Sequence, residues 1–205
     1  MDAVASYLIQ MIIPALAGAL FWGLSRPLRR SLLARKGLYA GACREGALLV
    51  LFMFLTGLLA LTLTPAGFWL AFLQGGPLPP FRPFQGGINL VPIRESWALL
   101  RYYVQHGLWS AILINFPGNI VMFLPIGFFS GLLMDKPAWW KSTLAALFLS
   151  LFIETFQLFV ARGTDVDDLI LNTLGGLMGH GLFLLLRRLD PGFVGRCAKR
   201  RKGCA

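Results

Sequence analysis

The chain has 205 residues, of which 57% are hydrophobic and only 14% are charged, and its formal net charge is +10. A typical soluble domain carries about 25% charged residues, so this composition excludes an ordinary soluble protein and indicates an integral membrane protein. The basic residues stand beside apolar stretches and form no separate soluble domain, which argues against nucleic-acid binding in spite of the positive charge.

Five apolar runs come close to the length of about 20 helical residues that a bilayer crossing needs. The predicted fold is therefore an all-α integral membrane protein, a bundle of about five transmembrane helices with a short interfacial helix. The expected spans are Tyr7–Leu24, Ala47–Leu63 (extending at most to Leu73), Ser110–Met134, Thr143–Val160 and Leu169–Leu186.

These spans divide the chain into four regions. Residues 1–73 hold two transmembrane helices with a basic loop, and residues 74–109 form an extracytoplasmic loop with the interfacial helix. Residues 110–186 form a core of three transmembrane helices, and residues 187–205 form a basic tail.

The basic residues set the expected orientation, because cytoplasmic loops of membrane proteins are enriched in lysine and arginine. With five spans, 15 of the 19 basic residues fall on one side, in two loops and the C-terminal tail. The N-terminus is therefore predicted to lie outside and the C-terminus in the cytoplasm. Cys43, Cys197 and Cys204 fall on the cytoplasmic side, where reduced thiols are expected. The end of the tail is expected to be disordered and to meet anionic lipid head groups.

The segment between the second and third spans has a different character. Residues 74–87 are rich in glycine and proline and cannot continue a helix. Trp97, Leu100, Val104 and Leu108 then recur at helical spacing, which predicts a short amphipathic helix at the membrane interface. The alternative is a connector that covers its own apolar face.

Polar side chains cluster at the outer end of the fourth span, although an ionisable group inside a membrane is costly. Glu154 and Gln157 are three residues apart, and Arg162 follows Glu154 by about two turns, so all three lie near one helix face. Glu154 lies about 12 Å deeper than Arg162 at 1.5 Å per residue. Its carboxylate must therefore be paired, be protonated or face water.

The start of the fifth span continues this cluster. Asp165, Asp168 and Asn172 can line one helix face. Alternatively, Asp165 caps the helix, with Asp167 and Asp168 favourable in its first turn. The same stripe continues into small residues that let two helices approach closely, within one chain or between two: Gly175, Gly176 and Gly179. His180 follows in the inner half, where packing is the expected role and a proton relay the alternative.

Two further segments place polar residues in the outer half. Asn115 and Asn119 are four apart in the third span, where they bind a ligand or join helices through their amides, and Pro125 is expected to kink that span. Asn89 and Arg94 lie in the outside loop. Such a one-sided set is typical of a site for a polar head group rather than of an ion path. The candidate ligand-binding residues are Asn89, Arg94, Asn119, Glu154, Gln157, Arg162, Asp165, Asp168 and Asn172.

Four motifs at these residues together resemble the VanZ-like family of bacterial membrane proteins. They occur in order over Asn89 to about Leu186: Asn89-Leu-Val-Pro92; Asn119-Ile-Val-Met-Phe123-Leu-Pro125-Ile-Gly127; Glu154-Thr-Phe-Gln157 with Arg162; and Asp165-Val-Asp167-Asp168-Leu-Ile-Leu-Asn172-Thr-Leu-Gly175-Gly176. The resemblance implies a small multi-span protein of the bacterial cell membrane. It also implies a link to lowered susceptibility to the glycopeptide antibiotic teicoplanin, which is attached to the family's founding member.

The preferred hypothesis is a non-catalytic envelope protein without cofactor or metal. It would bind a lipid or a lipid-linked cell-wall component, or change access to it. Arg94 and Arg162 would hold phosphate or carboxylate, while Asn119 and Asn172 orient the ligand. No nucleic-acid partner is expected, and the oligomeric state is left open.

The alternative hypothesis is an intramembrane hydrolase or transferase that acts on a lipid-linked substrate. Glu154 and Asp168 would then be the acid–base pair. In a variant of this hypothesis, the three aspartates at 165, 167 and 168 hold a divalent cation through their oxygens. A transporter ranks last, because polar groups do not reach both faces.

Overall fold

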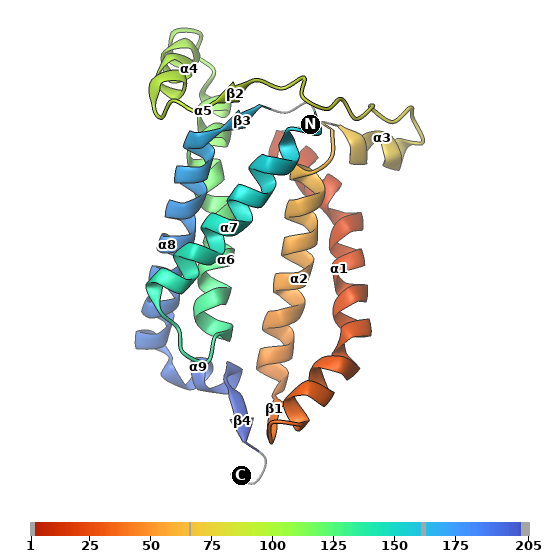
Figure 1. Ribbon diagram of the computed structural model, residues 1–205, viewed down its shortest axis with the longest axis vertical. Coiled ribbons are helices and arrows are strands. Elements are labelled where there is room, and N and C mark those ends of the chain that lie inside the picture. Colours follow the sequence, from red (N-terminus) through yellow and green to blue (C-terminus); the bar gives the residue numbers. More distant parts are fainter. Residues whose placement is uncertain (1–2, 66, 161–162, 202–205) are drawn as a thin grey trace.

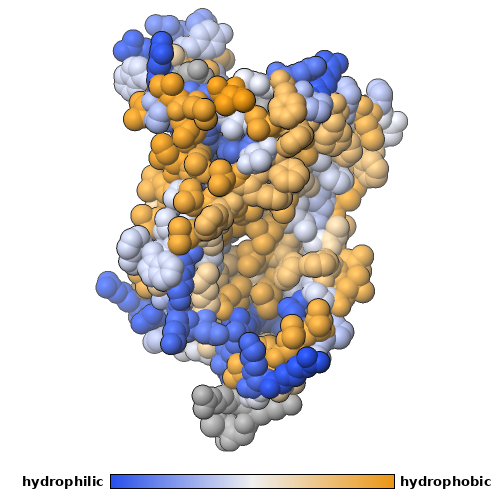
Figure 2. All heavy atoms as spheres, in the orientation of Figure 1, coloured by the Kyte–Doolittle hydropathy of each residue, from blue (hydrophilic) through white to orange (hydrophobic). Residues whose placement is uncertain are grey.

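The protein is a helical bundle, and a computed structural model describes residues 3–65, 67–160 and 163–201. The α1–α2 hairpin forms one side of the bundle, and α6, α7 and α8 pack together on the other (Figure 1). Figure 2 shows an apolar middle with polar side chains gathered toward the two ends, as a bilayer requires. The five long helices are α1 (Ala3–Ala34), α2 (Ala42–Thr62), α6 (Pro117–Leu133), α7 (Trp139–Gln157) and α8 (Val166–Leu189).

Four helical segments have the length and the apolar content of a membrane-spanning helix: Gln10–Ala34, Ala42–Thr62, Trp109–Leu133 and Val166–Leu189. They correspond to four of the five predicted spans. The helix α7 has 19 residues but lower hydropathy, because polar side chains occupy both of its ends. The chain is therefore a mostly helical membrane protein, and a fifth crossing through α7 stays a prediction.

The third predicted span is not one continuous helix. It consists of α5 (Trp109–Asn115) and α6, with Phe116 between them. Pro117 has no backbone N–H and suits the first turn of a new helix, so one helix ends before it and another begins there. Pro125, where a kink was expected, lies inside α6.

The predicted basic loop after the first span is mostly helical. The helix α1 continues past Leu24 to Ala34, and only the short strand β1 (Leu38–Ala40) separates it from α2. The extension is held by Glu45 of α2, whose carboxylate lies 3.0 Å from Arg29 Nη2 and 3.8 Å from Arg26 Nε. These ion pairs let the basic residues of α1 stay helical beside α2.

The described part of the C-terminal tail forms a helix and a strand, contrary to the expectation of a disordered end. Asp190 accepts a hydrogen bond from Phe193 N at 2.7 Å and so begins α9 (Pro191–Cys197). A carboxylate cap followed by proline at the first helical position is a helix-start signal that the sequence already carried. The strand β4 (Lys199–Arg201) then pairs antiparallel with β1.

The expectation of reduced thiols is wrong for two of the cysteines. Cys43, at the start of α2, and Cys197, at the end of α9, form a disulfide with a Cα–Cα distance of 4.8 Å. Packing of α9 against α2, 154 residues earlier in the chain, brings the two together. Cys204 lies outside the described residues.

At the opposite end lie the short elements α3 (Phe68–Gln74), β2 (Ile88–Asn89), α4 (Arg94–Gln105) and β3 (Thr164–Asp165) (Figure 1). The helix α4 covers the segment for which an amphipathic interfacial helix was predicted. Its position at a membrane interface stays a prediction.

The helices α6 and α8 are in backbone contact through glycines. A Cβ at Gly179 would collide with Leu124 O of α6, and a Cβ at Gly175 with Ile120 O. From the other side, a Cβ at Gly127 of α6 would collide with Gly176 O. The predicted small-residue stripe of α8 thus packs within the chain. This contact fixes the depth at which the first turn of α8 presents its carboxylates.

Candidate functional site

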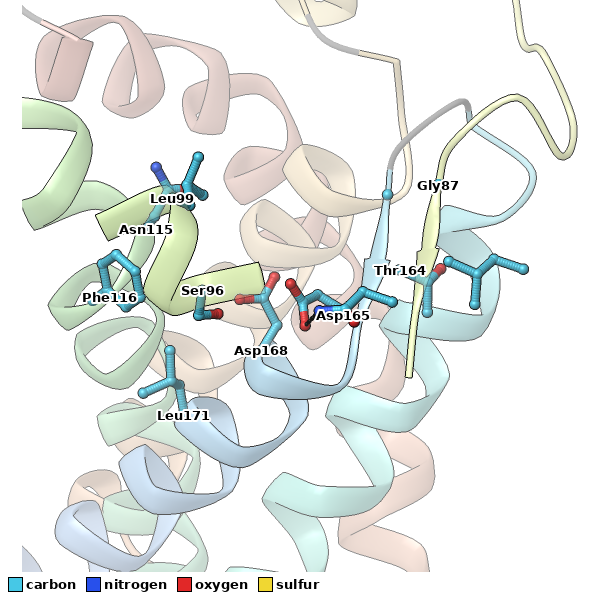
Figure 3. Close-up of a pocket in the computed structure, with 12 residues that line it drawn as sticks. Gly87, Ser96, Leu99, Asn115, Phe116, Thr164, Asp165, Asp168 and Leu171 are labelled. Carbon is cyan, nitrogen blue, oxygen red and sulfur yellow. Dashed lines mark hydrogen bonds between the residues drawn. The ribbon is translucent and has the colours of Figure 1, made fainter. Parts of the chain in front are cut away.

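A cavity of about 330 Å³ lies where α4, the α5–α6 junction, the two-stranded pair and the first turns of α8 meet (Figure 3). Its charged lining consists of the carboxylates of Asp165 and Asp168, and no lysine or arginine is among the described lining residues. Figure 3 shows Ser96 of α4 close to these carboxylates. The cavity is therefore acidic, with amide and hydroxyl groups around the two acids. It is lined by Gly87, Ile88, Asn89, Ser96, Leu99, Asn115, Phe116, Gly163, Thr164, Asp165, Asp168 and Leu171.

A two-residue parallel pair, β2 with β3, forms one wall. Asn89 lies opposite Asp165 in the register, although the two are 76 residues apart in the chain. The Asn89 side chain donates from Nδ2 to Asp165 Oδ1 at 3.0 Å and accepts from Val91 N at 3.0 Å. Asp165 also accepts from Asp167 N at 2.8 Å, so it caps α8. The capping and the site interpretations of Asp165 are therefore compatible.

Asp168 connects α8 to α6. Asn119 donates from Nδ2 to Asp168 Oδ1, and the same amide nitrogen lies 3.2 Å from Asn115 O. The exposed Asn115 side chain itself donates to Ala111 O at 2.8 Å and to Tyr103 Oη at 3.3 Å. The Asn119 amide thus occupies Oδ1 of Asp168, and Asp168 also lines the cavity.

Asp167 holds the start of α4 over the cavity. Both of its carboxylate oxygens accept from Ile93 N, at 2.8 and 3.0 Å. Ile93 has φ +70°, a conformation that a β-branched residue rarely adopts. A buried carboxylate on this N–H offsets the strain and fixes the direction in which α4 leaves the loop.

Glu154 lies beneath the cavity and is not one of its lining residues. It is only 5% exposed, and Oε2 accepts from Asp165 N at 3.0 Å. Thr164 Oγ1 donates to Glu154 O at 3.0 Å. Glu154 therefore supports β3 from below. The proposed acid–base partner Asp168 faces the cavity instead, so the two carboxylates do not share one opening.

The interface of α7 with α8 continues as a ladder of buried polar pairs. Asn172 donates from Nδ2 to Ser150 Oγ at 2.9 Å, and its Oδ1 has no partner within the described part of the chain. Further along, Ser142 Oγ lies 2.8 Å from His180 Nδ1, and both side chains are buried. These pairs join the helices, which gives His180 the packing role expected of it.

Of the nine candidate ligand-binding residues, Asn89, Asp165 and Asp168 line the cavity. Asn119 and Glu154 bond directly to lining residues, and Asn172 lies deeper. Arg94 is exposed at the start of α4 and is not a lining residue, while Gln157 is buried at the end of α7. Arg162 lies outside the described residues.

The sequence analysis missed the contribution of α4 and of the strand backbones. Ser96 and Leu99 reach the cavity from α4, and Thr164 from β3. A second cavity of about 390 Å³ adjoins it, and Tyr102 of α4 lines this second cavity together with Asp165. The helical period predicted α4, but its place over the aspartates depends on the β2–β3 pairing and on Asp167, which accepts from Ile93 N.

The described residues hold no group of three or more His, Cys, Asp or Glu side chains arranged to bind a metal ion. Ionised carboxylates accept hydrogen bonds, and they repel phosphate. The described lining of the cavity therefore suits hydroxyl groups or an ammonium group. The binding of phosphate or carboxylate by Arg94 and Arg162 stays a prediction, because Arg162 lies outside the described residues.

Together these features define a multi-helix integral membrane protein with an acidic cavity at one end of its bundle. A model of the VanZ/LLP1 family matches residues 48–187. The chain belongs to this family, as its motifs predicted. The match begins within α2, and so covers more of the chain than the motifs from Asn89 onward. Comparisons with curated proteins and with solved structures found no match.

Proposed function

We propose that this VanZ-family protein binds the polar head group of a lipid-linked cell-wall component at the outer face of the bacterial cell membrane. By doing so it would lower susceptibility to glycopeptide antibiotics of the teicoplanin type. The observation that carries the proposal is the acidic cavity of Asp165 and Asp168 at the end of the bundle where β3 leads into α8. The excess of basic residues at the opposite end supports an orientation with this cavity outside, whereas the Cys43–Cys197 disulfide at that same end is unusual for a cytoplasmic location.

The chemistry of the cavity favours particular parts of such a ligand. Two carboxylates with Ser96 and Asn115 can bind sugar hydroxyls or a peptide amine. The apolar flanks of the bundle would accommodate the lipid tail beside the cavity. Binding is favoured over catalysis, because Glu154 is buried and supports β3, so the acid–base pair of the alternative is not assembled around the cavity.

Two variants separate these functions. Asp168→Asn removes a lining charge while leaving an oxygen that can accept from Asn119. Glu154→Gln leaves an oxygen for Asp165 N and changes no lining residue. Wild type and variants would be expressed at matched membrane levels in a Gram-positive host, and susceptibility to teicoplanin and vancomycin measured.

We expect protection by wild type and by Glu154→Gln, and loss of protection with Asp168→Asn. An abundant but inactive Glu154→Gln would favour the intramembrane hydrolase or transferase instead. Absence of protection by abundant wild type would remove the antibiotic role.

Direct binding tests the ligand class. Protein in nanodiscs would be titrated with an undecaprenyl-pyrophosphoryl disaccharide-pentapeptide and, separately, with undecaprenyl phosphate. The proposal requires tighter binding of the sugar- and peptide-bearing lipid, weakened by Asp168→Asn. Equal or tighter binding of undecaprenyl phosphate would contradict it.

A further inference from the structure

A different cavity, of about 410 Å³, lies at the other end of the bundle from the acidic cavity, and the proposed function does not use it. Helices α2, α6, α8 and α9 surround it, together with β4 and the loop that follows α6. Its charged lining consists of Arg44, Arg187, Lys199 and Asp135. Cations thus outnumber carboxylates here, the reverse of the acidic cavity.

Arg44 is the most informative of these residues. It is only 8% exposed, and it donates from Nη1 to Cys197 O at 3.3 Å and from Nη2 to Leu133 O at 2.8 Å. Among the described residues no carboxylate forms an ion pair with it. Burying a cation is costly, and the charges of Asp135 and Glu45 offset that cost without forming an ion pair with Arg44, so an anion in the adjoining cavity would add a direct partner.

The only carboxylate of the lining is already engaged. Asp135 Oδ2 lies 2.7 Å from Lys199 Nζ, and its side chain is 61% exposed. A neighbouring cavity of about 580 Å³ shares both residues and adds Lys136 and Lys141. The positive charge of the lining therefore extends out to the surface.

The rest of the lining is apolar and includes Leu132, Phe183 and Val194. The cavity lies near the end of the bundle where α9 and β4 pack (Figure 1), and a lipid head group would lie at such an end in a bilayer. Cationic pockets between transmembrane helices at this depth bind the phosphates of anionic lipids. We propose that this cavity binds the phosphate of an anionic phospholipid, with Arg44 and Arg187 as the cations that face it.

Two neighbouring arginines provide the test. Arg187 lines the cavity, whereas its neighbour Arg188 is also exposed and does not line it. Full-length wild type, Arg187→Gln, Arg187→Lys and Arg188→Gln would be purified in neutral detergent. Retention of palmitoyl-oleoyl phosphatidylglycerol or phosphatidylcholine would be measured by native mass spectrometry, with and without inorganic phosphate as competitor. Thermal unfolding in phosphatidylcholine would check that each variant is folded.

We expect wild type to retain phosphatidylglycerol in preference to phosphatidylcholine. Arg187→Gln should weaken that retention by about tenfold or more, as expected for loss of a charge-assisted hydrogen bond. Arg187→Lys should keep most of it, and Arg188→Gln should match wild type. Equal weakening by both glutamine variants would indicate general surface attraction and overturn the proposal. So would retention that Arg187→Gln leaves unchanged, or displacement of the lipid by millimolar inorganic phosphate.

Discussion

The glycine contact between α6 and α8 makes a quantitative prediction, because α8 also carries a glycine outside that contact. A Cβ at Gly179 would meet Leu124 O and Phe128 N of α6, whereas a Cβ at Gly181, two residues later, meets nothing within 4 Å. Replacing glycine by alanine inside a helix gains up to about 1 kcal/mol of intrinsic propensity, and this gain is common to both positions. The difference between Gly179→Ala and Gly181→Ala therefore isolates the steric cost.

Overpacking a tight core costs about 1–3 kcal/mol. We expect the upper part of this range at Gly179, because the clash is with backbone, which cannot move aside as a side chain can. Gly179→Ala should thus be less stable than Gly181→Ala by about 3 kcal/mol. Gly181→Ala itself should equal or exceed wild type.

Unfolding by sodium dodecyl sulfate in mixed micelles, followed by tryptophan fluorescence, measures this difference. If the two variants unfold at the same detergent fraction, α6 and α8 are not in backbone contact and the argument fails. Destabilisation that appears only together with loss of a dimer would instead place the glycine face between two chains.

Two further predictions concern the two ends of the bundle. Asp167→Ala should cost about 1.5–3 kcal/mol locally, the value of a hydrogen bond to a charged group, because it removes the buried carboxylate that accepts from the strained Ile93 N–H before α4. Faster proteolysis of that loop with unchanged cleavage elsewhere checks it, and an unchanged rate would contradict it. At the other end, the hydrogen bond from Lys199 holds the pKa of Asp135 below its ordinary value of 3.8. A carboxyl with a lowered folded pKa stabilises the fold above its ordinary pKa and loses that contribution as pH falls through the folded pKa, so attachment of β4 should weaken below about pH 4. Amide hydrogen exchange of β4, corrected for intrinsic rates, should show this weakening in wild type and not in Asp135→Asn; equal pH dependence in both would refute it.

Local sequence patterns anticipated much of the molecule. Hydrophobic runs located the long helices, and three- and four-residue spacing placed Asp165, Asp168 and Asn172 near one another at the start of α8. These inferences succeed because helical period and capping depend only on near neighbours. The family motifs added Asn89 to the same group, and the structure bonds Asn89 to Asp165.

Other features depend on contacts between residues far apart in the chain and could not be predicted from local sequence patterns. The β2–β3 pair has only two residues per strand, too few for an alternating pattern, yet together with the Asp167–Ile93 hydrogen bonds it places Ser96 of α4 at the cavity. The disulfide of Cys43 with Cys197 required α9 to be recognised first. The signal for α9 was present in Asp190 and Pro191, but the basic composition of the tail suggested disorder.

The β1–β4 pair and the Cys43–Cys197 disulfide form a clasp between the α1–α2 connection and the C-terminal segment, and this clasp has a consequence for biosynthesis. Residues 38–43 are synthesised early. Their strand and disulfide partners lie in residues 197–201, which are the last described part of the chain to be made. The α1–α2 hairpin must therefore persist without its final partners while all the helices between are inserted. Translation proceeds at about 5–20 residues per second, so this interval is on the order of 8–30 s. During that time the packing of α1 against α2 and the ion pairs of Glu45, rather than the clasp, must keep the hairpin together.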